Sequence, residues 1–227
     1  MNTFLPTAGG YRKLLAFKLS EIICDLSMIF ARKFVRPGSR TRDQIEQAAR
    51  SGKQNIAEGS EASRTSKETE IKLTNVAKAS LEELLLDFGD HIRQNNLLLW
   101  EKDNPRTLRL REYLKSDVFM QNPTRFAERM SAEEYCNLMI TLINQTTYLL
   151  RRLIERQQQQ FLEQGGIKEQ MYRARVSYRN RYGFRSDRSD RSDKSDKSDK
   201  SDRSDQSDKS DQSDKSDKSD QSDRSDT

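Results

Sequence analysis

Apolar residues recur at steps of three and four positions in four separate stretches of the sequence, which is the period of an amphipathic helix. The stretches run from about residue 11 to 34, from 41 to 59, from 65 to 94 and from 131 to 165. An amphipathic helix needs another element to cover its apolar stripe, and four such helices can cover one another. The sequence therefore predicts an all-α fold, specifically a four-helix bundle.

Local signals mark where these helices begin and end. Three starts match the capping box, in which Ser or Thr is followed three residues later by Glu or Gln. The pairs are Thr41 with Gln44, Thr65 with Glu68, and Ser131 with Glu134. Pro37 and Gly38 should end the first helix, Gly59 the second, and Gly165 with Gly166 the fourth.

Two other features concern how the helices pack. The stripe of the second helix consists mostly of small residues, which allow close approach, so we expect this helix at the centre of the packing. Residues 97–130 look irregular, with one short helix over 106–114. Because a bare loop of that length is uncommon, we expect the segment to pack across the end of the bundle.

Residues 185–227 have a composition unlike the rest of the chain. From Arg185 to Asp226 a triplet of Arg, Lys or Gln followed by Ser and Asp repeats fourteen times, without an apolar residue. Such a segment cannot offset the entropy that folding costs, so we expect a disordered tail. The predicted organisation is a bundle over residues 1–164, a basic aromatic suffix over 165–184 and the repeat tail over 185–227.

Setting the tail apart reveals a basic body. The chain has 41 Lys and Arg against 36 Asp and Glu, of which the tail holds 11 and 14, so residues 1–184 carry a net charge of +8. Residues 1–58 and 165–184 hold most of the excess, and the second of these regions interleaves arginines with tyrosines. Concentrated positive charge is typical of surfaces that bind phosphate groups.

The cysteines and the N-terminus indicate a compartment. Cys24 and Cys136 are the two cysteines, without a Cys-x-x-Cys motif, and we interpret both as small buried hydrophobic residues. The first ten residues do not match a signal peptide, and no apolar run approaches the roughly 20 residues of a membrane-spanning helix. The sequence predicts a cytoplasmic protein without a membrane contact.

The inventory of chemically active groups is small. His91 is the single histidine, so a catalytic triad could use only that residue. No Glu-x-x-His pair for a di-iron site and no phosphate-binding glycine loop appear, and the acidic residues of 82–90 are spaced as a solvated helix face. We therefore expect no enzymatic activity, no metal and no cofactor.

Nucleic-acid binding accounts for the charge better. Phosphates are bound by Lys and Arg, and tyrosines interleaved with arginines can stack on unpaired bases. The first candidate set is Arg32, Lys33, Arg36, Arg40, Arg42, Arg50 and Lys53, around the connection between the first two helices. The second set is Lys168, Tyr172, Arg173, Arg175, Arg179 and Arg181. No base-reading motif is present, so we expect binding led by shape and charge rather than by sequence.

The second and third predicted helices also carry a longer motif. Its parts are Ala48–Gly59 with the core Asn-Ile-Ala-Glu-Gly, then Ser66, Glu68 and Ser-Leu-Glu-Glu-Leu at 80–84, with Tyr-Arg-Lys-Leu opening at residue 11. This motif resembles the bacterial four-helix-bundle family that includes proteins encoded in intervening sequences of ribosomal RNA genes. The longer third connection and the basic suffix resemble a subgroup of that family.

The resemblance implies a small basic homo-oligomer in a bacterium and carries over no catalytic residue. A relative in the same family, the accessory variability protein of diversity-generating retroelements, assembles as a pentameric barrel and works with nucleic acid and a reverse transcriptase. By that likeness, the partners implied for this chain are nucleic acid and further copies of itself, with a pentamer as one form.

Two questions stay open at this stage. Asn55, Glu58 and Gly59 could hold the turn to the next helix, by capping or an ion pair, or they could bind a ligand. The whole chain could also be an adaptor or assembly protein without a nucleic-acid role, because bundles with Ala- and Gly-rich faces associate readily. Salt separates these two functions, since phosphate binding weakens steeply with salt and a hydrophobic interface does not.

Overall fold

The computed structural model describes residues 10–182. The repeat tail, and with it the predicted disorder, lies outside the described residues. Within them every regular element is a helix and none is a strand, which confirms the all-α prediction. The elements are η1 (Tyr11–Lys13), α1 (Leu15–Phe34), α2 (Arg40–Ala62), α3 (Lys67–Gln94), α4 (Pro105–Leu114), α5 (Asp117–Gln121), η2 (Ala127–Arg129), α6 (Ala132–Gln164) and α7 (Ile167–Tyr182).

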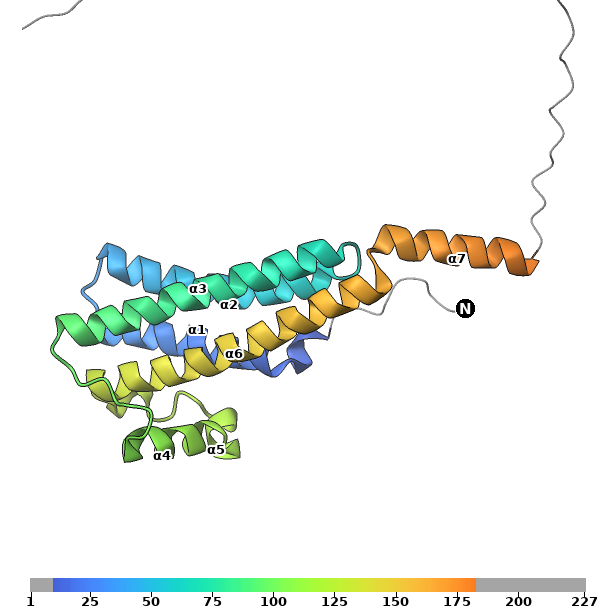
Figure 1. Cartoon of the computed structure of the whole chain (residues 1–227). Coiled ribbons are helices and arrows are strands. Elements are labelled where there is room, and N and C mark those ends of the chain that lie inside the picture. Colours follow the sequence, from blue (N-terminus) through green and yellow to red (C-terminus); the bar gives the residue numbers. More distant parts are fainter. Residues whose placement is uncertain (1–9, 183–227) are drawn as a thin grey trace, which may run out of the picture. The chain divides into compact units, whose positions relative to one another are not determined.

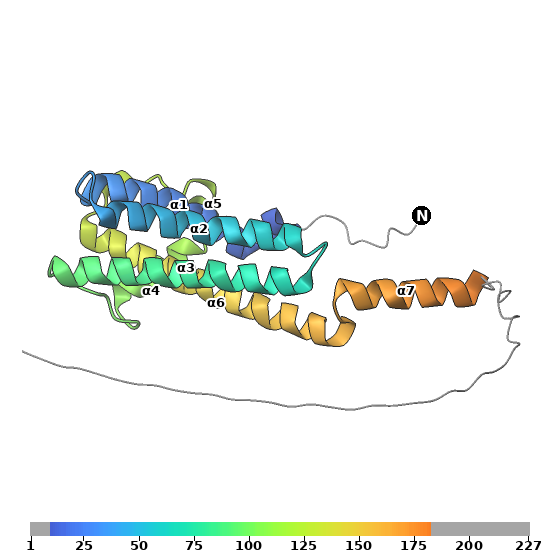
Figure 2. The same cartoon turned by 90° about the horizontal axis from the view of Figure 1, so that it is seen from above.

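The four long helices α1, α2, α3 and α6 pack side by side (Figures 1 and 2). α2 packs against α1 and α3, and α6 packs against the same two helices. Their apolar stripes meet in one core whose largest members are fully buried aromatic rings: Phe30, Phe88 and Tyr135. Burial of Tyr135 is accompanied by a hydrogen bond from its hydroxyl to the carbonyl oxygen of Leu26, at 2.8 Å. The core therefore joins α1, α3 and α6 directly.

The small residues of α2 allow close packing against α3, but they do not place α2 at the centre of the packing. α2 packs most extensively on α3, while Gln47, Arg50 and Gln54 on its outer side are exposed. A Cβ atom on Gly52 would lie 2.7 Å from Cδ2 of Leu81 in α3. The expectation that α2 lies at the centre of the packing is wrong, because its polar outer face leaves it at the periphery.

The starts of α2, α3 and α6 were predictable to within two residues, whereas α1 begins at Leu15, four residues after the predicted start. Ser131 and Glu134 form the expected capping box of α6, with Ser131 Oγ accepting from Glu134 N at 3.3 Å and Glu134 Oε2 accepting from Ser131 N at 3.0 Å. The other two predicted caps, Thr41 and Thr65, are wrong. Neighbouring serines take their places, as Ser39 accepts from Arg42 N and Ser66 accepts from Thr69 N.

Gly59 does not end α2, which continues to Ala62. Gly59 is instead buried at a close approach to α3, where an added Cβ would lie 3.2 Å from Cβ of Leu73 and 3.3 Å from the carbonyl oxygen of Glu70. Gly165 does end α6, as predicted, with a φ of +71° that favours glycine. A glycine in a helix pattern thus has two uses, and only contacts between helices distinguish them.

Residues 97–130 are more regular than expected. α4 confirms the predicted short helix, whereas α5 and η2 have no counterpart in the sequence prediction. The segment lies along the flank of α6 rather than across the end of the long helices (Figure 1). Asn137 of α6 secures it, since its Oδ1 accepts from Trp100 N at 2.8 Å and its Nδ2 donates to Leu98 O at 2.9 Å.

Candidate nucleic-acid interface

Three of the seven cations predicted around the α1–α2 connection are bound within the protein. Arg32 forms an ion pair with Glu128 of η2. Lys33 Nζ donates to the carbonyl oxygens of Glu128 and Met130, at 2.8 and 2.7 Å. Arg42 Nε lies 3.0 Å from Glu46 Oε1 on its own helix. These three side chains hold the 97–130 segment or their own helix and have fewer free donors for an external phosphate.

The other four members of that set are not a single patch. Arg36 and Arg40 are exposed at the connection itself. Arg50 lies about 15 Å further along α2 by helix rise, and Lys53 lies beyond it. Burial raises the pKa of Cys24, and Lys53 and Arg50 act against this shift, which places both cations near the middle of α1. The structure therefore separates the seven predicted residues into a held group, a pair at the connection and a pair beside Cys24.

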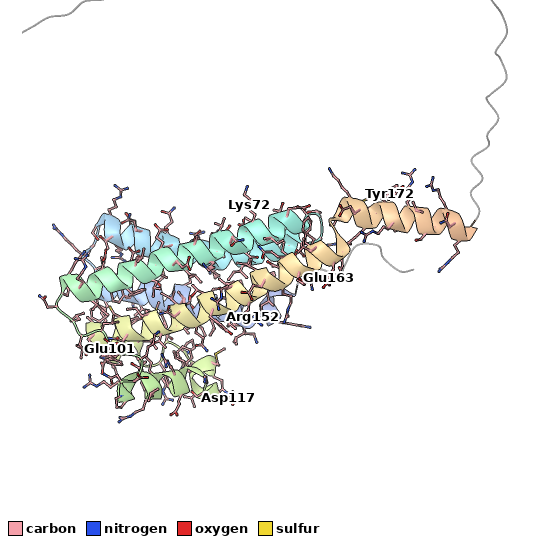
Figure 3. All side chains as sticks on the ribbon, viewed as in Figure 1. Lys72, Glu101, Asp117, Arg152, Glu163 and Tyr172 are labelled. Carbon is pink, nitrogen blue, oxygen red and sulfur yellow. The ribbon has the colours of Figure 1, made fainter. Side chains whose placement is uncertain are left out.

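The second predicted set lies on α7, and part of it shares one face. Lys168, Tyr172, Arg175 and Arg179 follow one another at steps of four, three and four, which places them on one side of the helix. We call these four residues the basic face of α7. All four are exposed. Tyr172, whose side chain is labelled in Figure 3, is 68% exposed. Arg173 and Arg181 lie on other sides, and Arg173 Nη1 donates to Gln164 O at 3.1 Å.

Little negative charge opposes the basic face. Glu169 is the single acidic residue of α7, and its Oε2 accepts a hydrogen bond from Gly166 N at 2.5 Å. The pKa of Glu68, at the start of α3, is lowered mainly by hydrogen bonds from its own backbone and from Ser66. The positive charge of Lys168 lowers this pKa to a smaller extent. Among the described residues, no cation of α7 lies within 4 Å of a carboxylate oxygen.

A second side of α7 is apolar. Ile167, Met171, Ala174 and Tyr178 follow one another at the same steps of four, three and four, and we call them the apolar face of α7. Met171 is 53% exposed, and the remaining three are exposed or half-buried. By helix geometry this face lies about 100° around the axis from the basic face. α7 thus presents two different surfaces side by side.

The Asn-Ile-Ala-Glu-Gly motif is part of the α2–α3 packing rather than of the turn. Asn55 Nδ2 donates to Ser51 O at 2.9 Å and to Ser51 Oγ at 3.1 Å, and Ser51 Oγ lies 2.9 Å from Ser80 Oγ in α3. Glu58 is exposed and forms no ion pair within residues 10–182. The alternative in which Asn55 and Glu58 hold the turn is not seen: the Asn55 amide bonds to Ser51, one helical turn back along α2, and Glu58 forms no ion pair among the described residues.

Sequence reasoning missed a cavity of about 550 Å³ between α4 and the first turns of α6. We call it the aromatic cleft, and its rings and cations are Trp100, Arg106, Arg109, Tyr113, Phe126 and Arg129. Two signals could have pointed to it. Trp100 is the single tryptophan of the chain, and Arg106, Arg109 and Tyr113 are spaced to share one face of α4.

The His, Cys, Asp and Glu side chains of the described residues do not gather into a metal site. No group of three or more of these side chains within residues 10–182 could hold a metal ion. The His91 ring packs against Phe30 with centroids 4.9 Å apart, and burial lowers the pKa of His91. Burial raises the pKa of the Cys136 thiol to about 12, which keeps it protonated at neutral pH. None of the helices in the described range has an apolar stretch long enough to cross a bilayer.

Comparisons with protein-family models, with curated proteins and with solved structures found no match. The resemblance to the bacterial four-helix-bundle family consequently remains a prediction that depends on the motif residues of α2 and α3. The function proposed below therefore rests on the surfaces of this chain alone.

Proposed function

We propose that this chain is a non-enzymatic nucleic-acid-binding protein that contacts RNA or DNA through the basic face of α7. The observation that carries the proposal is the alignment of Lys168, Arg175 and Arg179 with Tyr172 on one exposed side of a helix, without a carboxylate partner among residues 10–182. An exposed cation without a partner retains its full attraction for phosphate, whereas a paired one must first break its ion pair.

The geometry of a helix explains how four residues could act together. Lys168 and Arg179 are eleven residues apart, which is roughly 16 Å along the axis, so successive cations can follow a phosphate backbone. Tyr172 lies among them and is 68% exposed, and base stacking on an exposed ring depends little on base identity. Contacts of this kind support binding without sequence-specific readout.

We further propose that α1, α2, α3 and α6 constitute a four-helix bundle of the bacterial family that the motif resembles, and that the chain forms a homo-oligomer in the cytoplasm. The apolar face of α7 supports the association. If two copies pair through Met171 and Ala174, both apolar faces are covered, and both basic faces stay accessible because they lie about 100° away. Repeating the basic face in one assembly would strengthen its attraction for a polyanion.

A pair of matched double substitutions tests the binding surface. Arg175→Ala with Arg179→Ala removes two charges from the basic face, and Arg173→Ala with Arg181→Ala removes two from other sides of the same helix. We expect the first variant to weaken binding of a single-stranded 12-nucleotide RNA by about tenfold or more at 50 mM salt, measured by fluorescence anisotropy. The second variant should lose less than threefold. Equal losses would mean that net charge rather than this face binds the RNA.

The second candidate function is association with protein alone, and the apolar face of α7 is the feature that favours it. Met171→Asp should shift the mass of the full chain toward the monomer in analytical ultracentrifugation at micromolar concentration, while Lys72→Asp on the exposed side of α3 should not. An adaptor without a nucleic-acid role would show this shift and no RNA binding. A wild-type chain that is already monomeric would contradict the oligomer proposal.

A further inference from the structure

The aromatic cleft combines features that a ligand site needs and that nothing in the bundle requires. It is an open depression, and its volume of about 550 Å³ is comparable with that of pockets that bind small molecules. The floor is apolar, formed by Leu110, Met130 and Leu138, of which Leu138 is buried. The walls carry rings and guanidinium groups, so the cleft offers an apolar interior and a cationic rim.

One aromatic wall is held in a fixed orientation. Trp100 Nε1 donates to Glu133 Oε1 at 2.9 Å, and Trp100 N donates to Asn137 Oδ1 at 2.8 Å. The Arg106 guanidinium lies over the indole, with Cζ 5.4 Å from the ring centroid, and is 3.6 Å from Glu133. Because the indole is anchored at its polar edge, its face can receive a second flat group without losing these bonds.

The other aromatic wall consists of Tyr113 and Phe126, whose ring centroids are 6.2 Å apart. Both side chains are half-buried, so part of each ring borders the cleft. Tyr113 also packs edge-on against Phe119, which is fully buried. This second wall is therefore supported from behind by a fully buried ring of the main hydrophobic core.

Two cations on the rim have no internal role. Arg109 and Arg129 are exposed and form no ion pair with any described residue. The carboxylate that lines the same cleft, Glu134, accepts hydrogen bonds from the amide and hydroxyl of Ser131. The rim therefore favours an anion, and Glu134 remains able to accept a hydrogen bond from an N–H group of a base.

We propose that the aromatic cleft binds one unpaired nucleotide of a single-stranded nucleic acid, with the base against the ring walls and its phosphates on Arg109 and Arg129. The inference rests on the proposed nucleic-acid function and adds a second contact, built by residues 97–130, that selects single strands. A base inside a duplex is stacked on both sides and cannot enter a cleft lined by rings, whereas an unpaired base can.

The test uses Trp100 as a built-in reporter, since the chain has no other tryptophan. The full chain is excited at 295 nm and titrated with a single-stranded 12-nucleotide oligouridylate RNA, with the same length of duplex RNA and with uridine monophosphate. We expect saturable quenching by the single strand, and at least tenfold weaker effects of the duplex and the mononucleotide.

Matched variants identify the rim. Arg109→Ala with Arg129→Ala should raise the single-strand concentration at half-quenching about tenfold, because each of the two lost contacts from an exposed charge is worth roughly threefold. The control variant, Arg111→Ala with Lys115→Ala, loses the same charge from α4 and the residue after it. These two side chains line a different cavity, so the single-strand concentration at half-quenching should change less than threefold. All four side chains are exposed, so circular dichroism should be unchanged.

The outcomes separate this inference from the proposed function. RNA binding in the anisotropy assay without Trp100 quenching overturns the cleft and leaves α7 as the binding surface. Quenching that depends on Arg109 and Arg129 but not on the basic face of α7 supports the cleft and overturns the α7 proposal. Equal effects of the two α4 variant pairs, or quenching as strong with the mononucleotide as with the strand, would also overturn the cleft as a strand-binding site.

Discussion

Substituting Gly52 by Ala tests how closely α2 and α3 approach. Ala is favoured over Gly in a helix by about 1 kcal/mol, but here the new Cβ would lie 2.7 Å from Cδ2 and 2.9 Å from Cγ of Leu81. Leu81 is fully buried and cannot swing into solvent, so the helices must separate or Leu81 must leave its rotamer. Overpacking of this kind costs typically 1–3 kcal/mol, and a contact this short points to the upper end. The expected net loss is about 1–2 kcal/mol.

The matched control is Gly89→Ala in α3. A Cβ on Gly89 would meet nothing within 4 Å, so the helix preference for Ala should act alone and stabilise by about 0.5–1 kcal/mol. Urea unfolding followed by circular dichroism at 222 nm gives both free energies, and the two variants should differ by about 1.5–3 kcal/mol. In thermal unfolding each kcal/mol corresponds to about 2–4 °C at this size. A Gly52 variant that is as stable as the Gly89 variant would refute the close α2–α3 contact.

Three further perturbations have defined outcomes. Asn137→Ala should cost roughly 2–3 kcal/mol in urea unfolding and shift Trp100 emission to the red, because the Trp100 amide loses its acceptor; an unshifted spectrum would contradict this. Burial lowers the pKa of His91, so the unfolded state binds a proton more readily and stability should fall as pH drops below about 6.5. The His91→Gln variant should lose this dependence between pH 7.5 and 5.5. A stability–pH profile identical to that of the wild type would refute this reasoning. Cys24 and Cys136 are buried with raised pKa values, so a thiol reagent at pH 8 should label neither in the native chain and both in urea; rapid native labelling would show that the core is open.

Local signals in the sequence were sufficient for the long helices. The start and end of α6 follow from Ser131, Glu134 and Gly165, all of which act within one helical turn of their own position. The caps of α2 and α3 were displaced by two residues and one residue, because a serine lies within two residues of each threonine and the pattern does not distinguish them. In α2 the choice depends on Gly38, whose φ of +72° turns the chain immediately before Ser39.

Features that depend on distant contacts were beyond the sequence. Gly59 is compatible with a helix end or with close packing, and Leu73 of the next helix decides between them. Arg32 looked like part of a basic patch because its acidic partner, Glu128, is 96 residues away in the sequence. The aromatic cleft likewise forms only when α4 docks on α6, so its separate aromatic and basic residues had no common pattern along the chain. By contrast, the basic face of α7 follows from helix spacing alone.

The central claim is that the basic face of α7 binds nucleic-acid phosphates, and the salt dependence of RNA binding tests it most directly. Affinity of the full chain for a single-stranded 12-nucleotide RNA should fall linearly in a plot of log K against log salt concentration, between 50 and 300 mM. Removing two phosphate contacts with Arg175→Ala and Arg179→Ala should reduce the magnitude of the slope by about 1.4, since each contact to a single strand contributes roughly 0.7. An unchanged slope in this variant, or no binding at 50 mM salt, would contradict the account.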